Sequence, residues 1–324
     1  MGQRCLAVSL GTVLILTAAA VCEAQVFSAF NGPVDWGRTG ASYKPVPGYY
    51  VNPGVRKFIN SFASYQYPYA PGFVGQSRLE FPIDNWFGGI QCSNTFNSMS
   101  FNAEIWWRIN ETIGLKTQDS DWEDGIYPPD QKTAFSETRN RMSDGYWVDV
   151  NVDFEALAGL VASLRPVAGV RFQRFHFIAG DGFQWSLPGS SFPTEPLNGD
   201  VYDVSFTFVH YYLGAKAGLW VGPFGVTLQA DYAYLTVNQD DHHLLREPWR
   251  CADKGTGYCW HLAGGVSLSV SNSVSLRLEG DFKRLVTTDC PHTWADTDDP
   301  EQSWGGAKVW SDQQSVTGYA EFRF

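Results

Sequence analysis

Apolar and polar residues alternate over several stretches of this chain. Within 226–234 every second residue is apolar and most of those between are polar. The stretches 266–270 and 274–278 repeat the pattern on either side of a turn at 271–273. Successive side chains of a β-strand point to opposite faces, so a period of two predicts strands with one apolar face. That face must be covered either by a protein core or by lipid.

The lengths of the connections favour lipid. Short links alternate along the chain with long polar ones, and the long ones are 117–143, 182–200, 244–258 and 287–312. Outer-membrane barrels show this asymmetry, with tight periplasmic turns and long outer loops. The last alternating segment ends in Phe324, and a terminal aromatic resembles the tag read by the barrel-assembly machinery. We therefore predict an all-β fold, a ten-stranded antiparallel transmembrane β-barrel with long extracellular loops.

Residues 1–24 predict export. Arg4 precedes a nearly continuous apolar run, Cys5–Val21, and small residues then mark a cleavage position. A lipoprotein signal centred on Cys22 is the alternative. After cleavage, residues 25–324 form one domain without an apolar run of about 18 residues, the length that a helical span needs. The expected location is the outer membrane of a Gram-negative cell, reached through a cleaved signal peptide.

Composition limits the partners. The formal net charge of -11 argues against nucleic acid and suits cationic ligands. Aromatic residues make up 15% of the chain, which is high for an acidic soluble enzyme and usual for a girdled barrel. Export permits disulfides, and a surface staple among the last three mature cysteines is expected, with three pairings open. The four mature cysteines, whose spacing lacks the short paired repeat of a metal site, are Cys92, Cys251, Cys259 and Cys290.

Two carboxylates follow the predicted strand 101–115. Asp119 and Asp121 are two residues apart, so on an extended backbone they point the same way. Like charges this close cannot both ionise freely, so one should hold its proton to higher pH. Such a pair can hold a water and share a proton, as acid–base chemistry requires. A solvated acidic loop and a loose calcium site are the alternatives.

A second motif follows the strand that begins at 225. An Asp beside a His can orient the imidazole and stabilise its charged form. Strict alternation turns Asp241 and His243 inward, whereas a one-residue bulge, common at barrel rims, turns Asp240 and His242 inward. We assign the site to Asp240 and His242, with an exposed polar loop and adventitious metal binding by His242 and His243 as the alternatives. The other histidines are isolated in the sequence and predicted to be wall or loop residues: His176, His210, His261 and His292.

These residues resemble the omptin family, the outer-membrane proteases of Gram-negative bacteria. Ser77–Phe81 is similar to the family's Ser-Gln-Leu-Asp-Trp, and Gln118–Trp122 to its Asp-Gln-Asp-Trp. Ala168–Gly182 follows a signature of the fifth strand. Asn238–His242 resembles Asp-Asn-Asp-Glu-His. The likeness covers most of residues 77–324.

The resemblance implies a ten-stranded barrel with a groove across its top and an endopeptidase site there. In the family's mechanism a water lies between the Asp119–Asp121 pair and His242, with His242 as general base and Asp240 orienting it. Neither a metal nor an organic cofactor takes part, although lipopolysaccharide is expected to be required for activity. Arg174 matches an arginine that contacts lipopolysaccharide phosphate. Peptides or proteins outside the cell are the expected substrates.

Some family positions differ. The acid two residues before the catalytic Asp is Asn238 here, and another acid that holds a basic substrate side chain falls near Ser64. The resemblance therefore leaves the preferred side chain at the cleaved bond open. The second long loop carries Thr138 and Asn140 where the family has Ser and His, but the water mechanism needs neither.

An omptin-type aspartic endopeptidase of the cell surface is the leading hypothesis. A catalytically inactive omptin-like barrel that acts as an adhesin or receptor is the second, motivated by the replaced acids. A small porin is the third, although ten strands leave little lumen once side chains fill it.

Overall fold

The computed structural model of the chain describes residues 48–68, 75–123, 131–159, 161–187, 190–246, 250–287, 290–295 and 301–324. The predicted signal peptide at 1–24 lies outside these ranges. Among the residues described, no helix is long and apolar enough to cross a lipid bilayer.

Nearly all of the described residues belong to β-strands. The strands of the first half are β1 (Gly48–Phe58), β2 (Phe62–Pro68), β3 (Gln76–Pro82), β4 (Trp86–Phe96), β5 (Met99–Arg108), β6 (Thr112–Trp122), β7 (Ala134–Phe154) and β8 (Leu157–Ala158). Those of the second half are β9 (Ala162–Ser186), β10 (Glu195–Val221), β11 (Phe224–His243), β12 (Arg250–Ser269), β13 (Val274–Thr287), β14 (Cys290–Ala295) and β15 (Gln302–Arg323). A short 3-10 helix, Leu244–Arg246, follows β11.

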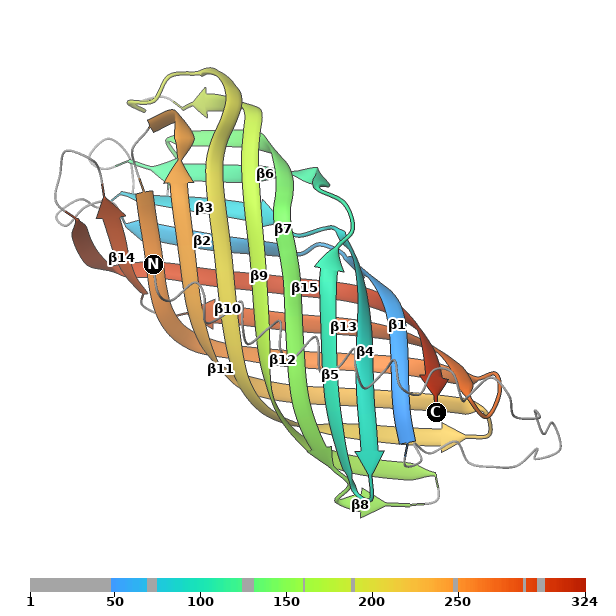
Figure 1. Cartoon of the computed structure of the whole chain (residues 1–324). Helices are drawn as coiled ribbons and strands as arrows, with labels where there is room; N and C mark the ends of the chain where they lie inside the picture. Colours follow the sequence, from blue (N-terminus) through green and yellow to red (C-terminus); the bar gives the residue numbers. More distant parts are fainter. Residues whose placement is uncertain are drawn as a thin grey trace, which may run out of the picture.

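Ten of these strands close into a ring. The order is β1, β4, β5, β7, β9, β10, β11, β12, β13 and β15, and β15 pairs back with β1. Every pairing is antiparallel, and Figure 1 shows the long tilted strands wrapped into one cylinder. The predicted ten-stranded antiparallel barrel is confirmed.

The wall continues beyond this ring as a second section. There β15 pairs with β2, β2 with β3, β3 with β6 and β6 with β7, while β14 joins β12 to β15. Between the sections the Asp84 carboxylate accepts from the amides of Asn60 and Ser61, and the Asn85 amide donates to the Asn110 carbonyl. These contacts divide the predicted strand 101–115 into β5 and β6, so its prediction as one strand is wrong.

The outer wall of the first section is apolar. Large apolar side chains there are exposed, as Leu213 (70%) and Val266 (55%) show. Aromatic pairs lie along the same wall, including Tyr232 with Tyr258 and Trp260 with Phe282. Lipid is the environment in which this surface is stable, because water would leave a continuous apolar belt unburied.

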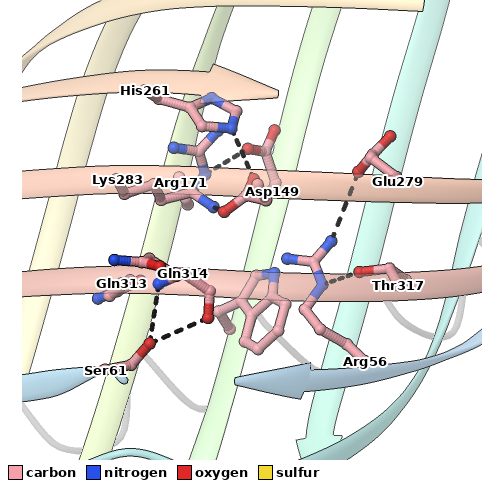
Figure 2. A network of polar contacts seen from close by, with 12 residues as sticks. Arg56, Ser61, Asp149, Arg171, His261, Glu279, Lys283, Gln313, Gln314 and Thr317 are labelled. Carbon is pink, nitrogen blue, oxygen red and sulfur yellow. Dashed lines mark hydrogen bonds and ion pairs between the residues drawn. The ribbon is translucent and has the colours of Figure 1, made fainter. Parts of the chain in front are cut away.

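The lumen of the first section is polar. Arg171 Nε donates to Asp149 at 2.8 Å and Arg56 Nε donates to Thr317 at 2.6 Å, and Figure 2 shows these contacts. A cavity of about 260 Å³ remains among these side chains. Pairing of opposite charges is what permits them to remain buried.

A layer of aromatic rings lies above this polar lumen. Phe58 of β1 packs edge-on against Trp147 of β7 and Phe175 of β9, with ring centroids 5.6 and 6.5 Å apart. The layer is fully buried and consists of Phe58, Phe81, Phe87, Trp147, Phe175, Phe177 and Phe206. Rings from non-neighbouring strands meet here, so side chains fill the lumen at this level. This argues against the porin hypothesis.

The outer connections are shorter than predicted. Only 123–133 lies between β6 and β7, and only 187–194 between β9 and β10. A further strand, β14, occupies part of the predicted loop 287–312. Backbone groups need partners above the bilayer as well as within it, and pairing with the next strand supplies them. Polar sequence therefore does not mark the end of a strand in this barrel.

The expected disulfide staple is not present among the residues that the structure describes. Cys92, Cys251, Cys259 and Cys290 form no disulfide there, and Cys259 and Cys290 are buried. Cys251 and Cys259 are eight residues apart on the single strand β12, which separates them by roughly 26 Å. Cys251 pairs across the sheet with Trp294 and not with Cys290. A disulfide needs Cα atoms within about 7 Å.

Gly89 of β4 should tolerate no side chain. A Cβ there would lie 2.3 Å from the Trp106 ring and 2.5 Å from the Ile105 carbonyl oxygen. We expect Gly89→Ala to destabilise the barrel by about 1–3 kcal/mol through overpacking. Gly114→Ala is the matched control because nothing lies within 4 Å of its Cβ position. Thermal unfolding in detergent, followed by heat-modifiable gel migration, measures both. Equal losses would contradict this explanation.

Candidate active site at the barrel mouth

The outer end of the barrel carries the predicted acidic pair on β6. Asp119 and Asp121 pair across the sheet with Leu79 and Ser77, so they share one face of the strand. Ser77 Oγ donates to Asp119 Oδ1 at 3.3 Å, and the Tyr202 hydroxyl donates to Asp119 Oδ2 at 2.7 Å. Both donors are buried, so Asp119 faces the interior of the mouth.

Tyr202 links Asp119 to a histidine of β11. It lies on β10, where its cross-strand partner is His243. The imidazole of His243 packs edge-on against the Tyr202 ring, with centroids 4.8 Å apart and planes at 73°. The hydroxyl at the far end of that ring binds Asp119. A carboxylate and an imidazole that are distant in sequence therefore contact one tyrosine.

The register of β11 decides which Asp and His face the mouth. Its pairing with β10 and β12 is continuous to the end of the strand, without the bulge that Asp240 and His242 required. Asp241 is accordingly buried, at 6% exposure. Asp240 is exposed, and the Asn238 amide donates to it at 2.6 Å. The inward placement predicted for Asp240 and His242 is wrong, because alternation puts Asp241 and His243 on the inner face.

Asp241 lies in a dry part of the mouth. The Tyr65 hydroxyl of β2 donates a hydrogen bond to its Oδ2 atom. Burial raises the pKa of Asp241 to about 7, the hydrogen bond from Tyr65 opposes that rise, and the charges of Asp253 and Asp203 add to it. Protonated and ionised Asp241 therefore coexist near neutral pH, which is the condition an acid–base group needs.

Three tyrosines of the mouth were missed in the sequence. Burial raises the pKa of the Tyr67 hydroxyl, and the charges of Asp241 and the Asp119–Asp121 pair raise it further. Tyr65 and Tyr67 are two residues apart in a strand that leads to an outer loop. Asp119 and Asp121 show the same feature, a spacing of two residues beside an outer loop. Tyr202 carries no comparable signal, because it follows an ordinary alternating run.

The inner positions that precede the site carry no acid. Gln239, two residues before Asp241 on the same face, is fully buried and pairs across the sheet with Phe206 and Asp253. On β2 the residue facing the mouth is Tyr65, because Ser64 lies on the opposite face of the strand. An amide and a phenol group therefore occupy these two inner positions.

Arg174 lies on the outer wall. Its guanidinium donates to the Thr207 hydroxyl at 3.4 Å. Its cross-strand neighbour on β7 is Tyr146, which stacks on Phe172 with centroids 5.8 Å apart. The arginine is thus placed beside outward aromatic rings.

Comparisons with known proteins identify the fold. No family model and no curated protein matches the sequence. Among solved structures, the outer membrane protease OmpT from Escherichia coli superposes with a TM-score of 0.73 at 16% identity, covering 86% of this chain and 97% of that one. The translocator domain of the autotransporter NalP from Neisseria meningitidis gives 0.37 at 12% identity, covering 88% and 91%. The toluene transporter TodX from Pseudomonas putida gives 0.30 at 8%, covering 86% and 91%.

Proposed function

We propose, from the fold that this chain shares with the omptin outer-membrane protease OmpT, that it is a cell-surface endopeptidase. Its site would consist of Asp119, Asp121, Asp241 and His243. The observation that carries the proposal is the contact of Tyr202 with both Asp119 and His243. Through this contact Asp119 and the imidazole of His243 lie on either side of one tyrosine side chain.

In this mechanism a water held by Asp119 and Asp121 attacks the scissile carbonyl carbon. His243 accepts the proton of the water, and the imidazolium then donates it to the departing amine as the tetrahedral intermediate collapses. Ionised Asp241 stabilises the imidazolium. General acid–base groups placed in this way contribute roughly 10²–10⁴-fold each. No covalent bond to the protein forms.

Cofactor and partners follow from the same proposal. In the part of the chain that the structure describes, no three His, Cys, Asp or Glu side chains are arranged to hold a metal ion. The expectation that catalysis needs neither a metal nor an organic cofactor stays a prediction. Arg174, on the outer wall, would contact a phosphate group of lipopolysaccharide. In our proposal the protein needs bound lipopolysaccharide for activity. Phe324 would be read by the barrel-assembly machinery.

An inactive barrel that serves as an adhesin or receptor is the second candidate. The Tyr65 hydroxyl donates a hydrogen bond to one oxygen of Asp241. With a pKa of about 7, the Asp241 carboxyl group is protonated in a large fraction of the molecules at neutral pH. A protonated Asp241 does not stabilise an imidazolium.

A peptide library separates the two functions. Protein refolded with lipopolysaccharide should cleave internal bonds of a mixed peptide library, with sites read by mass spectrometry and with rates unchanged by EDTA. Because Gln239 and Tyr65 replace acids, we expect the cleavage sites not to be confined to Lys and Arg. Folded barrel that cleaves nothing in the library and binds a host or lipid ligand would favour the second candidate.

A further inference from the structure

The barrel mouth contains a second Asp–His pair, and in this one both side chains are buried. Asp253 of β12 lies opposite His292 of β14, and His292 Nδ1 is 2.7 Å from Asp253 Oδ1. Both side chains are fully buried. The Tyr67 ring stacks on the imidazole with centroids 4.3 Å apart, and Trp304 packs against it at 5.0 Å. These rings shield the pair from water.

This pair adjoins Asp241. On neighbouring strands Asp241 lies opposite Cys251, and Gln239 lies opposite Asp253. Asp253 is therefore the diagonal neighbour of Asp241 on the inner face, at about 7 Å. One oxygen of each carboxyl group is hydrogen-bonded: Oδ2 of Asp241 to Tyr65, and Oδ1 of Asp253 to His292. The other two oxygens, Oδ1 of Asp241 and Oδ2 of Asp253, are buried without a hydrogen bond to any residue of the described ranges.

Two carboxyl groups in one dry site do not ionise independently. Burial raises the pKa of Asp253, while the hydrogen bond and charge of His292 oppose that rise. His292 therefore favours the ionised form of Asp253, and a charge on Asp253 disfavours ionisation of Asp241. The titratable groups around Asp241 are Tyr65 and Tyr67 from β2, Asp203 from β10, Cys251 and Asp253 from β12, and His243 on its own strand.

We propose that Asp253 and His292 are a positioning pair for the mouth: by keeping Asp253 charged, His292 controls whether the neighbouring Asp241 is ionised. The pair touches neither the water nor the substrate. Its effect on cleavage rests on the proposed function of Asp241 and His243. The coupling between the two carboxyl groups stands without that function.

The pH profile of cleavage tests the effect on activity. Asp253→Asn should move the acidic limb of kcat/KM to lower pH by about one unit, because a neighbouring negative charge at this distance is lost. At a pH one unit below the midpoint of the wild-type limb, the variant should then retain a fraction of its maximal kcat/KM that is about fivefold larger than the fraction that the wild type retains. His292→Gln should move the limb in the same direction, because Asp253 without its partner takes up a proton. The double variant should move it no further than either single variant.

An exposed carboxylate provides the control. Asp200 is half exposed and pairs with Arg141 on the outer wall, so Asp200→Asn should leave the limb in place. Lower activity of Asp253→Asn at every pH, without movement of the limb, would assign the pair a merely structural role and overturn the proposal.

A second measurement needs no activity. The infrared C=O band of protonated Asp241, obtained as the difference between wild type and Asp241→Asn, should titrate about one unit lower in the Asp253→Asn background. His292→Gln carries the same expectation if Asp253→Asn does not refold. An unmoved titration refutes the coupling. A moved titration in a barrel that cleaves no peptide would refute the proposed function alone.

Discussion

His243→Ala should lower kcat/KM for a cleaved peptide by about 10²–10⁴-fold, whereas His242→Ala should leave it within about threefold. The two histidines are adjacent, but continuous pairing of β11 places them on opposite faces. His243 contacts Tyr202, whose hydroxyl binds Asp119. The measurement is peptide hydrolysis by protein refolded with lipopolysaccharide, with heat-modifiable migration as the check on folding.

The aspartates provide the same comparison. Asp241→Asn should reduce cleavage strongly, and Asp240→Asn, which alters an exposed carboxylate bonded to Asn238, should not. Loss of activity in His242→Ala and Asp240→Asn, with normal rates in the other two variants, would show that the rim rearranges when substrate binds. It would restore the assignment made from the family motif.

Asp119→Asn should lower kcat/KM by about 10²-fold or more. The substitution keeps the shape of the side chain but removes the charge that would position and polarise the attacking water. Tyr202→Phe should cost less, on the order of tenfold, because it removes one hydrogen bond from Asp119. Initial rates and KM for one cleaved peptide distinguish these effects, since both losses should fall mainly on kcat.

Asp200→Asn is the control for this series, because its carboxylate is exposed on the outer wall. Folded Asp119→Asn that cleaves peptides at the wild-type rate would exclude the paired carboxylates from the chemistry. A larger loss in Tyr202→Phe than in Asp119→Asn would instead give the tyrosine hydroxyl a direct role.

The architecture was predictable because the alternating pattern is a property of each strand by itself. The stretches 226–234 and 274–278 lie on β11 and β13, with the expected apolar side facing outward. The ends of the strands were less predictable. Between the strands, the Asp84 carboxylate accepts from the amides of Asn60 and Ser61, and the Asn85 amide donates to the Asn110 carbonyl. No local sequence signal announces these partners.

The spacing of Asp119 and Asp121 predicts the acidic pair of the proposed site, whereas the Asp and His that face the mouth lie one residue beyond those that the family motif indicates. Family likeness aligned Asp240 and His242, but the alternation that begins in the membrane continues through the rim and selects Asp241 and His243. Buried partners such as Tyr65 and His292 come from strands β2 and β14, whose closeness to β11 and β12 depends on closure of the barrel. Closure brings together residues that no sequence window contains.

The aromatic layer between the mouth and the polar lumen determines whether a peptide can pass through the barrel. A peptide that entered from outside would meet edge-on packed rings and not a passage, so both fragments of the proposed cleavage would leave through the opening by which the intact peptide arrived. The proposed reaction would then take place without opening a path through the barrel.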